Sequence, residues 1–241
     1  MEITRLETTH STNSWVGDHA NELKAPQLVY SYEQTAGRGQ RGNAWESAPG
    51  MNITATLFFK PENFPASDQF SISEGIALAI TDFLKTLGVE TTVKWPNDIY
   101  AGNRKICGIL VEHVVMGHNI SRTIAGFGIN INQTDFKSDA PNPVSVKMLT
   151  GKNYDIDKII PLLAEHLEKV FYRIQDPEYL HEEFKDRLWR KDGEYHLFYD
   201  KKKDEQISAL ISDVEPSGML LLTTDEGEER KYAFKEVEYL L

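Results

Sequence analysis

The stretch QTAGRGQRGNAW, residues 34–45, carries residue types that suit an anion-binding loop. Its glycines permit backbone turns that direct N–H groups toward a ligand, and Arg38 and Arg41 supply forked donors for phosphate or carboxylate. Trp45 offers a flat apolar face for a ring. Taken alone, the stretch is explained equally well by a site for an adenylate-like ligand and by an exposed loop with solvated arginines.

The glycine spacing also matches G-x-G-x-x-G at Gly37, Gly39 and Gly42. A dinucleotide fingerprint, however, needs a helix that opens directly after the last glycine. Here NAWESAPG follows, and then an expected strand, so a nicotinamide dehydrogenase is disfavoured. The sequence contains no Walker A motif, no G-x-S-x-G and no zinc-ligand spacing.

A second polar group lies in KWPNDIYAGNRKICGILVE. Pro96 forces a turn, so we expect Asn97 and Asp98 to point outward as a pair. Asp98 could orient a lysine or hold Mg²⁺ beside a triphosphate. Lys105 could reach a ligand anion from the start of an apolar strand, although a surface lysine explains it as well. Cys107, inside ICGILV, is interpreted as a buried strand residue rather than a nucleophile.

A third group is GFGININ, residues 126–132. Glycine within a strand often marks the close approach of a ligand or of another segment of backbone. Asn130 could bond phosphate or ribose, and an ordinary strand-end turn is the alternative.

Apolar periodicity and turn residues predict the elements that must position these groups. Ser11 or Thr12 can cap the first helix, Ser67 can cap the second, and Gly88 can end it. From Trp189–Gly193 onward the sequence consists of short predicted strands separated by charged turns, which predicts a domain boundary before a small all-β barrel. Within this barrel, KKK at 201–203 is expected to be a solvated hairpin tip. The expected helices are 12–24, 67–88, 155–174 and 177–187, and the expected strands are 28–34, 51–59, 121–132, a hairpin within 91–115 that turns at Gly102-Asn103, and short strands in 195–234.

Composition limits the class of protein. The 241 residues carry a net charge of −11 and a single cysteine, which excludes an internal disulfide and suits a reducing compartment. The acidic balance disfavours nucleic acid as a partner, and no segment is long and apolar enough to span a bilayer. We therefore expect a cytoplasmic protein with no DNA and no membrane partner.

In order along the chain, HSTNSW, QTAGRGQRGNAW, KWPNDIYAGNRKICGILVE and GFGININ resemble the motifs of the biotin–protein ligases. The resemblance implies an α+β fold: a class II aminoacyl-tRNA-synthetase-like mixed-sheet catalytic domain at 1–190 and an SH3-like β-barrel at 191–241. It also implies two steps. Biotin and MgATP give biotinyl-5′-AMP, which acylates one lysine of a biotin carboxyl carrier protein, a subunit of acetyl-CoA carboxylase or a related carboxylase.

The resemblance also assigns roles to matching positions. Lys105, Arg38 and Asp98 would be catalytic, with Asp98 as a candidate Mg²⁺ ligand. The loop at 34–45 would order over the adenylate and shield it from water. The implied biotin contacts are Ser11, Thr12, Asn13, Gln34, Arg38, Gly39, Gln40, Lys105 and Gly108, and the implied ATP contacts are Arg38, Arg41, Trp45 (stacking on adenine), Asn97 and Asn130.

Two departures qualify the resemblance. Many relatives read GRGRRG where this chain reads GRGQRG, so Gln40 replaces an arginine whose charge Arg41 would have to supply. The chain also begins only ten residues before the STN motif, so we expect no N-terminal winged helix-turn-helix and no repressor role.

Two rivals remain. A lipoate–protein ligase shares the fold and the adenylation, although GRGQRG and KWPND favour biotin. A non-catalytic biotin sensor belongs to another class, and the presence of Lys105, Arg38 and Asp98 favours catalysis. A homodimer is possible, with the sheet edge near 110–132 as a candidate interface.

Overall fold

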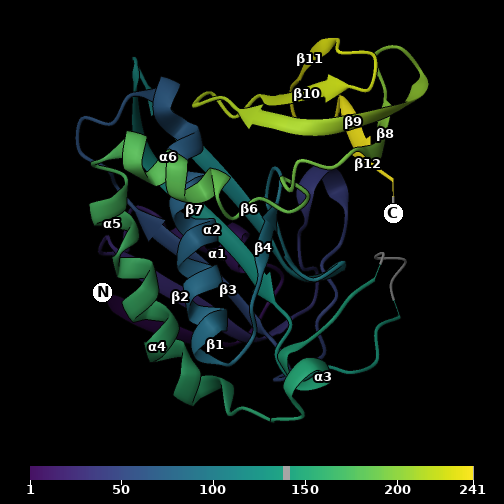
Figure 1. The fold of residues 1–241 in the computed structure, drawn as a ribbon. Coiled ribbons are helices and arrows are strands. Elements are labelled where there is room, and N and C mark those ends of the chain that lie inside the picture. Colours follow the sequence, from purple (N-terminus) through teal and green to yellow (C-terminus); the bar gives the residue numbers. More distant parts are fainter. Residues whose placement is uncertain (138–141, 241) are drawn as a thin grey trace.

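The computed structural model describes residues 1–137 and 142–240, and within them the fold is a mixed α+β arrangement of two sheets and a layer of helices (Figure 1). The large sheet has the order β1-β2-β3-β7-β6-β5-β4; β1 and β2 run parallel, and the other neighbours are antiparallel. Its strands are β1 Glu2–Thr9, β2 Gln27–Gln34, β3 Ile53–Phe59, β4 Thr92–Lys94, β5 Asp98–Ala101, β6 Arg104–Met116 and β7 Asn119–Ile129.

Helices cover both faces of this sheet. On one face α2, Gln69–Thr86, buries an almost continuous apolar surface, and Gly88 ends it with a positive φ of 85°. The helices α4, α5 and α6 pack against α2. On the other face α1, Thr12–His19, packs Val16 onto Val29 and Phe58. The remaining bounds are α3 Val146–Thr150, α4 Ile156–Glu168, α5 Val170–Arg173, α6 Pro177–Lys185 and the short 3₁₀ turns η1 Gln40–Gly42 and η2 Ala66–Asp68.

The C-terminal residues form a separate antiparallel sheet of order β11-β10-β9-β8-β12, above the large sheet in Figure 1. The indole N–H of Trp95, in the β4–β5 turn, donates to the Gly218 carbonyl at 3.0 Å, and the Trp95 ring meets Phe234 edge to face. These contacts fix the second sheet beside the β4–β5 turn. Its strands are β8 His196–Asp200, β9 Glu205–Val214, β10 Leu220–Thr224, β11 Glu229–Tyr232 and β12 Val237–Tyr239.

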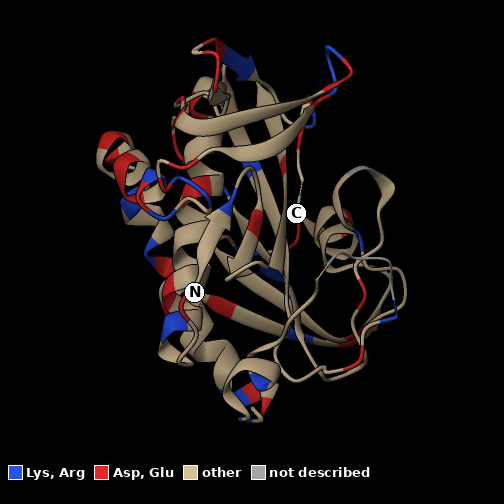
Figure 2. Cartoon of the chain, turned by 45° about the vertical axis from the view of Figure 1, so that its right-hand side comes forward, with Lys and Arg blue, Asp and Glu red and all other residues tan. Residues whose placement is uncertain are grey.

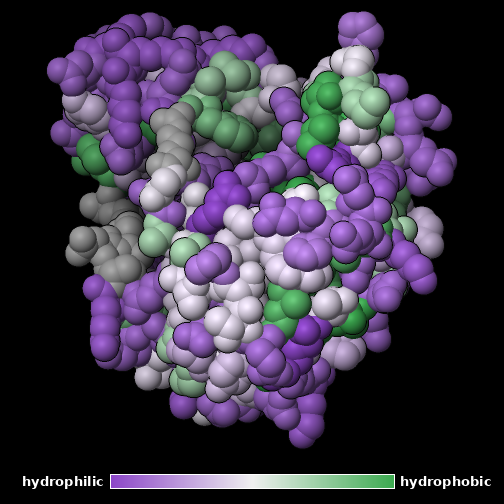
Figure 3. Space-filling model, turned by 180° about the vertical axis from the view of Figure 1, so that it is seen from behind, coloured by the Kyte–Doolittle hydropathy of each residue, from purple (hydrophilic) through white to green (hydrophobic). Residues whose placement is uncertain are grey.

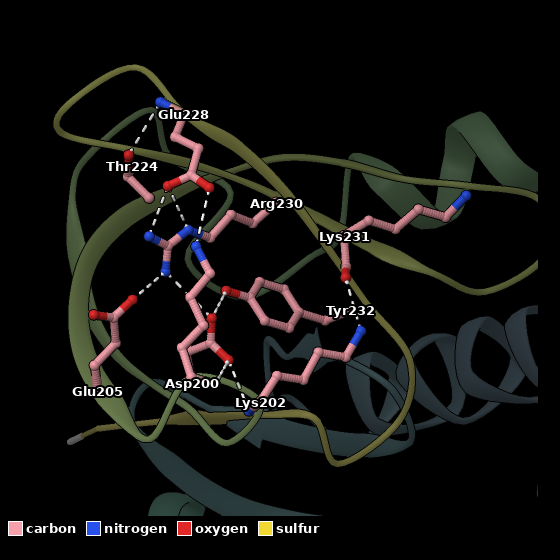
Figure 4. A network of polar contacts seen from close by, with 9 residues as sticks. Asp200, Lys202, Glu205, Thr224, Glu228, Arg230, Lys231 and Tyr232 are labelled. Atoms are coloured by element: carbon pink, nitrogen blue, oxygen red, sulfur yellow. Dashed lines mark hydrogen bonds and ion pairs between the residues drawn. The ribbon is translucent and has the colours of Figure 1, made fainter.

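A buried carboxylate organises this second sheet (Figure 4). Asp200 is 1% exposed and accepts hydrogen bonds from the Tyr232 hydroxyl at 2.6 Å and from Arg230 at 3.2 Å. Its other oxygen accepts the backbone N–H groups of Lys202 and Lys203. Because every side of the carboxylate has a donor, the charge is satisfied, and the β8–β9 turn is held in shape.

The surface is polar. Acidic and basic residues are interspersed over the helices and loops (Figure 2). Seen from behind, the molecule is largely hydrophilic, with hydrophobic residues in small separate groups (Figure 3). No helix among the described residues is long and apolar enough to cross a bilayer.

Most predicted elements are present, with shifted ends, and several corrections apply. The sequence patterns missed β1, α3 and β12, and the expected helix at 155–174 is divided into α4 and α5. Ser67 is not the cap of α2: it lies in η2, and Asp68 occupies the N-cap position. KKK at 201–203 lies in the β8–β9 turn and is exposed, as predicted, and each lysine also has an acidic partner: Lys201 with Glu238, Lys202 with Glu236 and Lys203 with Glu228.

Candidate functional site

A cavity of about 210 Å³ opens over β6 and β7, and we call it the central cavity. It brings together all four sequence motifs. All predicted site residues line it except Arg41, whose side chain lies outside the described part of the structure, and Asn130. The lining predicted residues are Ser11, Thr12, Asn13, Gln34, Arg38, Gly39, Gln40, Trp45, Asn97, Asp98, Lys105 and Gly108.

The floor of the cavity is made of glycines. Gly108 on β6 pairs with Gly128 on β7, and Gly126 lies two residues away on the same face. A Cβ at Gly128 would meet the Trp45 ring at 2.1 Å, and one at Gly126 would meet the Asn13 amide at 2.0 Å. The glycines do allow a close approach, but the approaching groups are the side chains of Asn13 and Trp45, whereas a ligand or another segment of backbone was predicted.

The STN motif is fixed at the start of α1. Ser11 occupies the N-cap position without a side-chain capping bond, which leaves its hydroxyl at the cavity. The Gln34 side-chain carbonyl accepts the Thr12 backbone N–H at 2.8 Å. The Thr56 hydroxyl lies 2.8 Å from Thr12 Oγ1 and 2.7 Å from Asn13 Oδ1. These bonds present a preorganised set of buried polar groups to a ligand.

The glycine-rich loop folds back on itself beside this set. Gly37 and Trp45 are joined by a backbone bond of 2.9 Å, and Gly39 and Asn43 by one of 2.7 Å. A Cβ at Gly37 would lie 2.6 Å from the Trp45 carbonyl oxygen, so the fold-back requires glycine there. Gly42 alone among the three loop glycines has a positive φ, 82°.

Arg38 reaches across the cavity to an acidic partner on β6. Its Nη2 lies 2.7 Å from Glu112 Oε1, and the same carboxylate accepts the Asn13 amide at 2.9 Å. The ion pair is exposed, 45% at Arg38 and 38% at Glu112, so it contributes little to stability, about 0–1 kcal/mol, and can be exchanged. Sequence reasoning missed Glu112 and Thr56; the available signal was a carboxylate that ends the apolar run ICGILV.

Lys105 pairs with Asp98 at 2.7 Å across the β5–β6 hairpin, and its Nζ lies 5.7 Å from the Trp45 ring centroid. Of the two possible roles for Asp98, the geometry therefore provides lysine orientation. The Asn97 amide donates to the Ile109 carbonyl at 2.6 Å and braces the hairpin. Among the described residues no three His, Cys, Asp or Glu side chains gather as possible metal ligands.

Asn130 and Cys107 do not line the central cavity. Asn130, which follows β7, is buried and donates to the Val144 carbonyl at 3.1 Å. Cys107 is fully buried on β6, where burial raises the pKa of its thiol, in agreement with a packing role.

The model of the biotin/lipoate A/B protein ligase family matches residues 3–130. The bifunctional ligase/repressor BirA of Escherichia coli is 32% identical over 67% of this chain and 51% of its own length, and the biotin–[acetyl-CoA-carboxylase] ligase of Paracoccus denitrificans is 32% identical over 66% and 68%. The chain thus spans about half the length of the Escherichia coli relative.

The same fold occurs in a solved structure. The biotin protein ligase from Aquifex aeolicus in complex with biotin and ATP superposes with a TM-score of 0.78 over 99% of both chains, at 19% identity. At that identity the likeness concerns the fold.

Proposed function

The chain belongs to the biotin/lipoate A/B protein ligase family, and from this membership we propose that it is an ATP-dependent biotin–protein ligase. It forms biotinyl-5′-AMP from biotin and ATP, and then transfers the biotinyl group to a lysine of a biotin carboxyl carrier protein. One observation carries the proposal: Arg38 and Lys105, far apart in sequence, line one cavity with the STN residues. The Paracoccus relative is a biotin–[acetyl-CoA-carboxylase] ligase and the Aquifex protein is in complex with biotin and ATP, which supports the choice of substrates.

In the first step a biotin carboxylate oxygen attacks the α-phosphorus of ATP. An O–P bond forms, the bond from the α-phosphorus to the β-bridging oxygen breaks, and pyrophosphate leaves with the electron pair. The two reactants are anions, so their approach needs cations that stabilise the charge of the transition state. Lys105 and Arg38 fill this role by exchanging Asp98 and Glu112 for the substrate anions.

Biotin is oriented by the polar set at the start of α1. Ser11, Thr12 and Asn13 bond the ureido head, and Gln34 completes that pocket. Thr56 and Glu112 act behind them by fixing the Asn13 amide. Gly108 and Gly39 allow the ligand to approach the backbone closely. Gln40 contributes an uncharged hydrogen-bond donor from the glycine-rich loop.

The nucleotide occupies the other part of the cavity. Adenine stacks on the face of Trp45 that is turned away from the glycine floor. Asn97 and Arg41 contact the nucleotide, and Asn130 supports it from the end of β7. Mg²⁺ enters with the triphosphate as MgATP, and Asp98 can contribute one carboxylate oxygen.

In the second step the neutral amine of the acceptor lysine attacks the biotinyl carbonyl carbon and forms the C–N bond of an amide. The bond from that carbon to the phosphate oxygen breaks, AMP leaves with the electron pair, and the amine releases a proton to solvent. We place the carrier at the open side of the cavity, beside the part of β6 that extends past β5. The same edge is the candidate homodimer interface. The finer fold assignment also belongs to this proposal: residues 1–190 form a class II synthetase-like catalytic domain and residues 191–241 an SH3-like barrel.

Pyrophosphate release tests the proposal. Mixing the protein with biotin and MgATP should release pyrophosphate up to one equivalent per active site, and lipoate should not replace biotin. Release with lipoate alone would make the chain a lipoate–protein ligase, and no release with either acid would make it a sensor without catalysis.

A further inference from the structure

A hydrogen-bond network fixes the segment that directly follows Trp45. The Glu46 carboxylate accepts the backbone N–H of Lys137, whose nitrogen lies 2.9 and 3.0 Å from the two carboxylate oxygens, and the Gln133 side-chain amide at 3.1 Å. Glu46 follows the glycine-rich loop, whereas Gln133 and Lys137 follow β7. Glu46 therefore joins two segments that are 87 residues apart in sequence.

Gln133 is 5% exposed, and its side-chain amide uses all of its hydrogen-bonding positions. Its Nε2 donates to Glu46 and, at 2.9 Å, to the Asp135 carbonyl. Its Oε1 accepts the Ala48 backbone N–H at 2.9 Å and the Asn52 amide at 2.7 Å. A flipped amide would set donors against donors, so its orientation is fixed, and position 46 faces donors only. A carboxylate, which accepts and does not donate, suits that position.

Asn52 ties this network to the large sheet. It directly precedes β3, is 2% exposed, and its Oδ1 accepts the Ile131 backbone N–H at 3.0 Å just after β7. We call Glu46, Gln133 and Asn52 the amide network. Because two of its members are buried and bonded at the ends of neighbouring strands, the network gives Glu46 a rigid support.

Trp45 depends on its neighbours in the chain for its position. Its ring lies on the glycine floor, but its indole N–H is buried and makes no hydrogen bond among the described residues. Since the indole has no other hydrogen-bonding group, no directional bond of the side chain fixes the ring. The backbone does so on both sides: the Trp45 N–H donates to the Gly37 carbonyl at 2.9 Å, and the next residue, Glu46, is held by the amide network.

We propose that Glu46 is a positioning residue for the nucleotide: by fixing the backbone after Trp45, it holds the indole ring in the place where adenine stacks. This inference rests on the proposed function, in which adenine stacks on Trp45. The biotin-side residues Thr12 and Gln34 lie on other elements and are joined by a bond of their own at 2.8 Å. Loss of Glu46 should therefore weaken the binding of the nucleotide more than that of biotin.

Glu46→Ala tests the proposal, because it leaves the N–H groups of Lys137 and Gln133 without this acceptor. The KM for MgATP in biotin-dependent pyrophosphate release should rise by about 10-fold, as expected for the loss of roughly one hydrogen bond, whereas the KM for biotin should stay near that of the unaltered protein. Glu46→Gln keeps one acceptor oxygen and should recover part of the affinity for MgATP. Glu62→Ala, at an exposed position after β3, is the matched control and should leave both KM values unchanged.

A double-mutant cycle with Trp45→Ala shows whether Glu46 acts through the indole ring. If it does, adding Glu46→Ala to Trp45→Ala should raise the KM for MgATP no further. Full additivity of the two changes would overturn the inference, and so would an unchanged KM for MgATP in Glu46→Ala or an equal rise in both KM values. Absence of pyrophosphate release in the unaltered protein would instead refute the proposed function.

Discussion

The central cavity and the Asp200 network both contain ion pairs, and the two regions use them differently. In the cavity, Arg38–Glu112 and Lys105–Asp98 have side chains 21% to 45% exposed, beside open space. In the C-terminal sheet, Asp200 is 1% exposed, and both of its oxygens accept several donors. A ligand anion can replace a partner in the first region but not in the second. Exposure and donor count thus separate exchangeable charges from structural ones.

The largest expected effect is on stability, at Asp200. Asp200→Ala leaves the Tyr232 hydroxyl and two backbone N–H groups without their acceptor, although Arg230 keeps Glu205 and Glu228. The change should lower the free energy of unfolding by about 3–5 kcal/mol, because each unsatisfied buried donor costs about 1–3 kcal/mol. Urea unfolding measures this. Asp225→Ala, at an exposed turn, should change it by less than about 0.5 kcal/mol. Equal effects of the two changes would remove the distinction between the two regions.

Lys105→Met should act on chemistry and not on folding. It removes a cation from the reaction centre, and the rate of biotin-dependent pyrophosphate release should fall by about 100- to 1000-fold, the range for deleting one electrostatic stabiliser. Urea unfolding of this variant should stay near that of the unaltered protein, because its ion pair is partly exposed. A variant that adenylates normally would exclude Lys105 as the central charge.

Arg38→Ala should weaken the retention of biotinyl-5′-AMP more than the affinity for biotin. Loss of its charged donors should speed the release of biotinyl-5′-AMP by about 10- to 100-fold in a single-turnover assay, while the affinity for biotin falls less. Arg38→Lys retains a charge and should recover part of the retention. Unchanged release would show that the glycine-rich loop holds the adenylate by other groups.

The smallest expected effect is on the pH dependence of stability, through the buried pair His181–Glu74. His181 Nδ1 lies 2.6 Å from Glu74 and its Nε2 donates to the Val214 carbonyl, joining α2 and α6 to β9. The Glu74 hydrogen bond raises the pKa of His181, and Lys185 opposes it; burial raises the pKa of Glu74. Both groups bind protons more tightly when folded, so their contribution is present at low pH and falls as pH rises through the folded pKa values.

The stability difference between the unaltered protein and His181→Gln should accordingly shrink from pH 6 to pH 9. The comparison between the two proteins cancels the opposite trend from His113 and His166, whose pKa values burial lowers. A difference that grows over this range would mean that His181 is neutral in the folded state.

The features that depend on short stretches of sequence were predicted correctly. Four short motifs identified the residues that line the central cavity, because each motif holds its own turn or strand chemistry. The glycines of GFG predicted a close approach, but the approaching side chains, Asn13 and Trp45, come from α1 and from the glycine-rich loop, which only the tertiary fold brings onto β7. Glu112 and Thr56 were missed because only the tertiary fold brings them beside Asn13.

Long-range pairing explains the remaining misses. The strand β1 has charged residues and one exposed edge, and it exists through parallel pairing with β2. The short β12 depends on β8 in the same way.

Intact mass of a carrier domain, after incubation with this protein, biotin and MgATP, tests the central claim most directly. The account predicts a gain of one biotinyl group on one lysine, with the gain strongly slowed by Lys105→Met. A carrier whose mass stays unchanged with the unaltered protein, or rises equally fast with Lys105→Met, would contradict it.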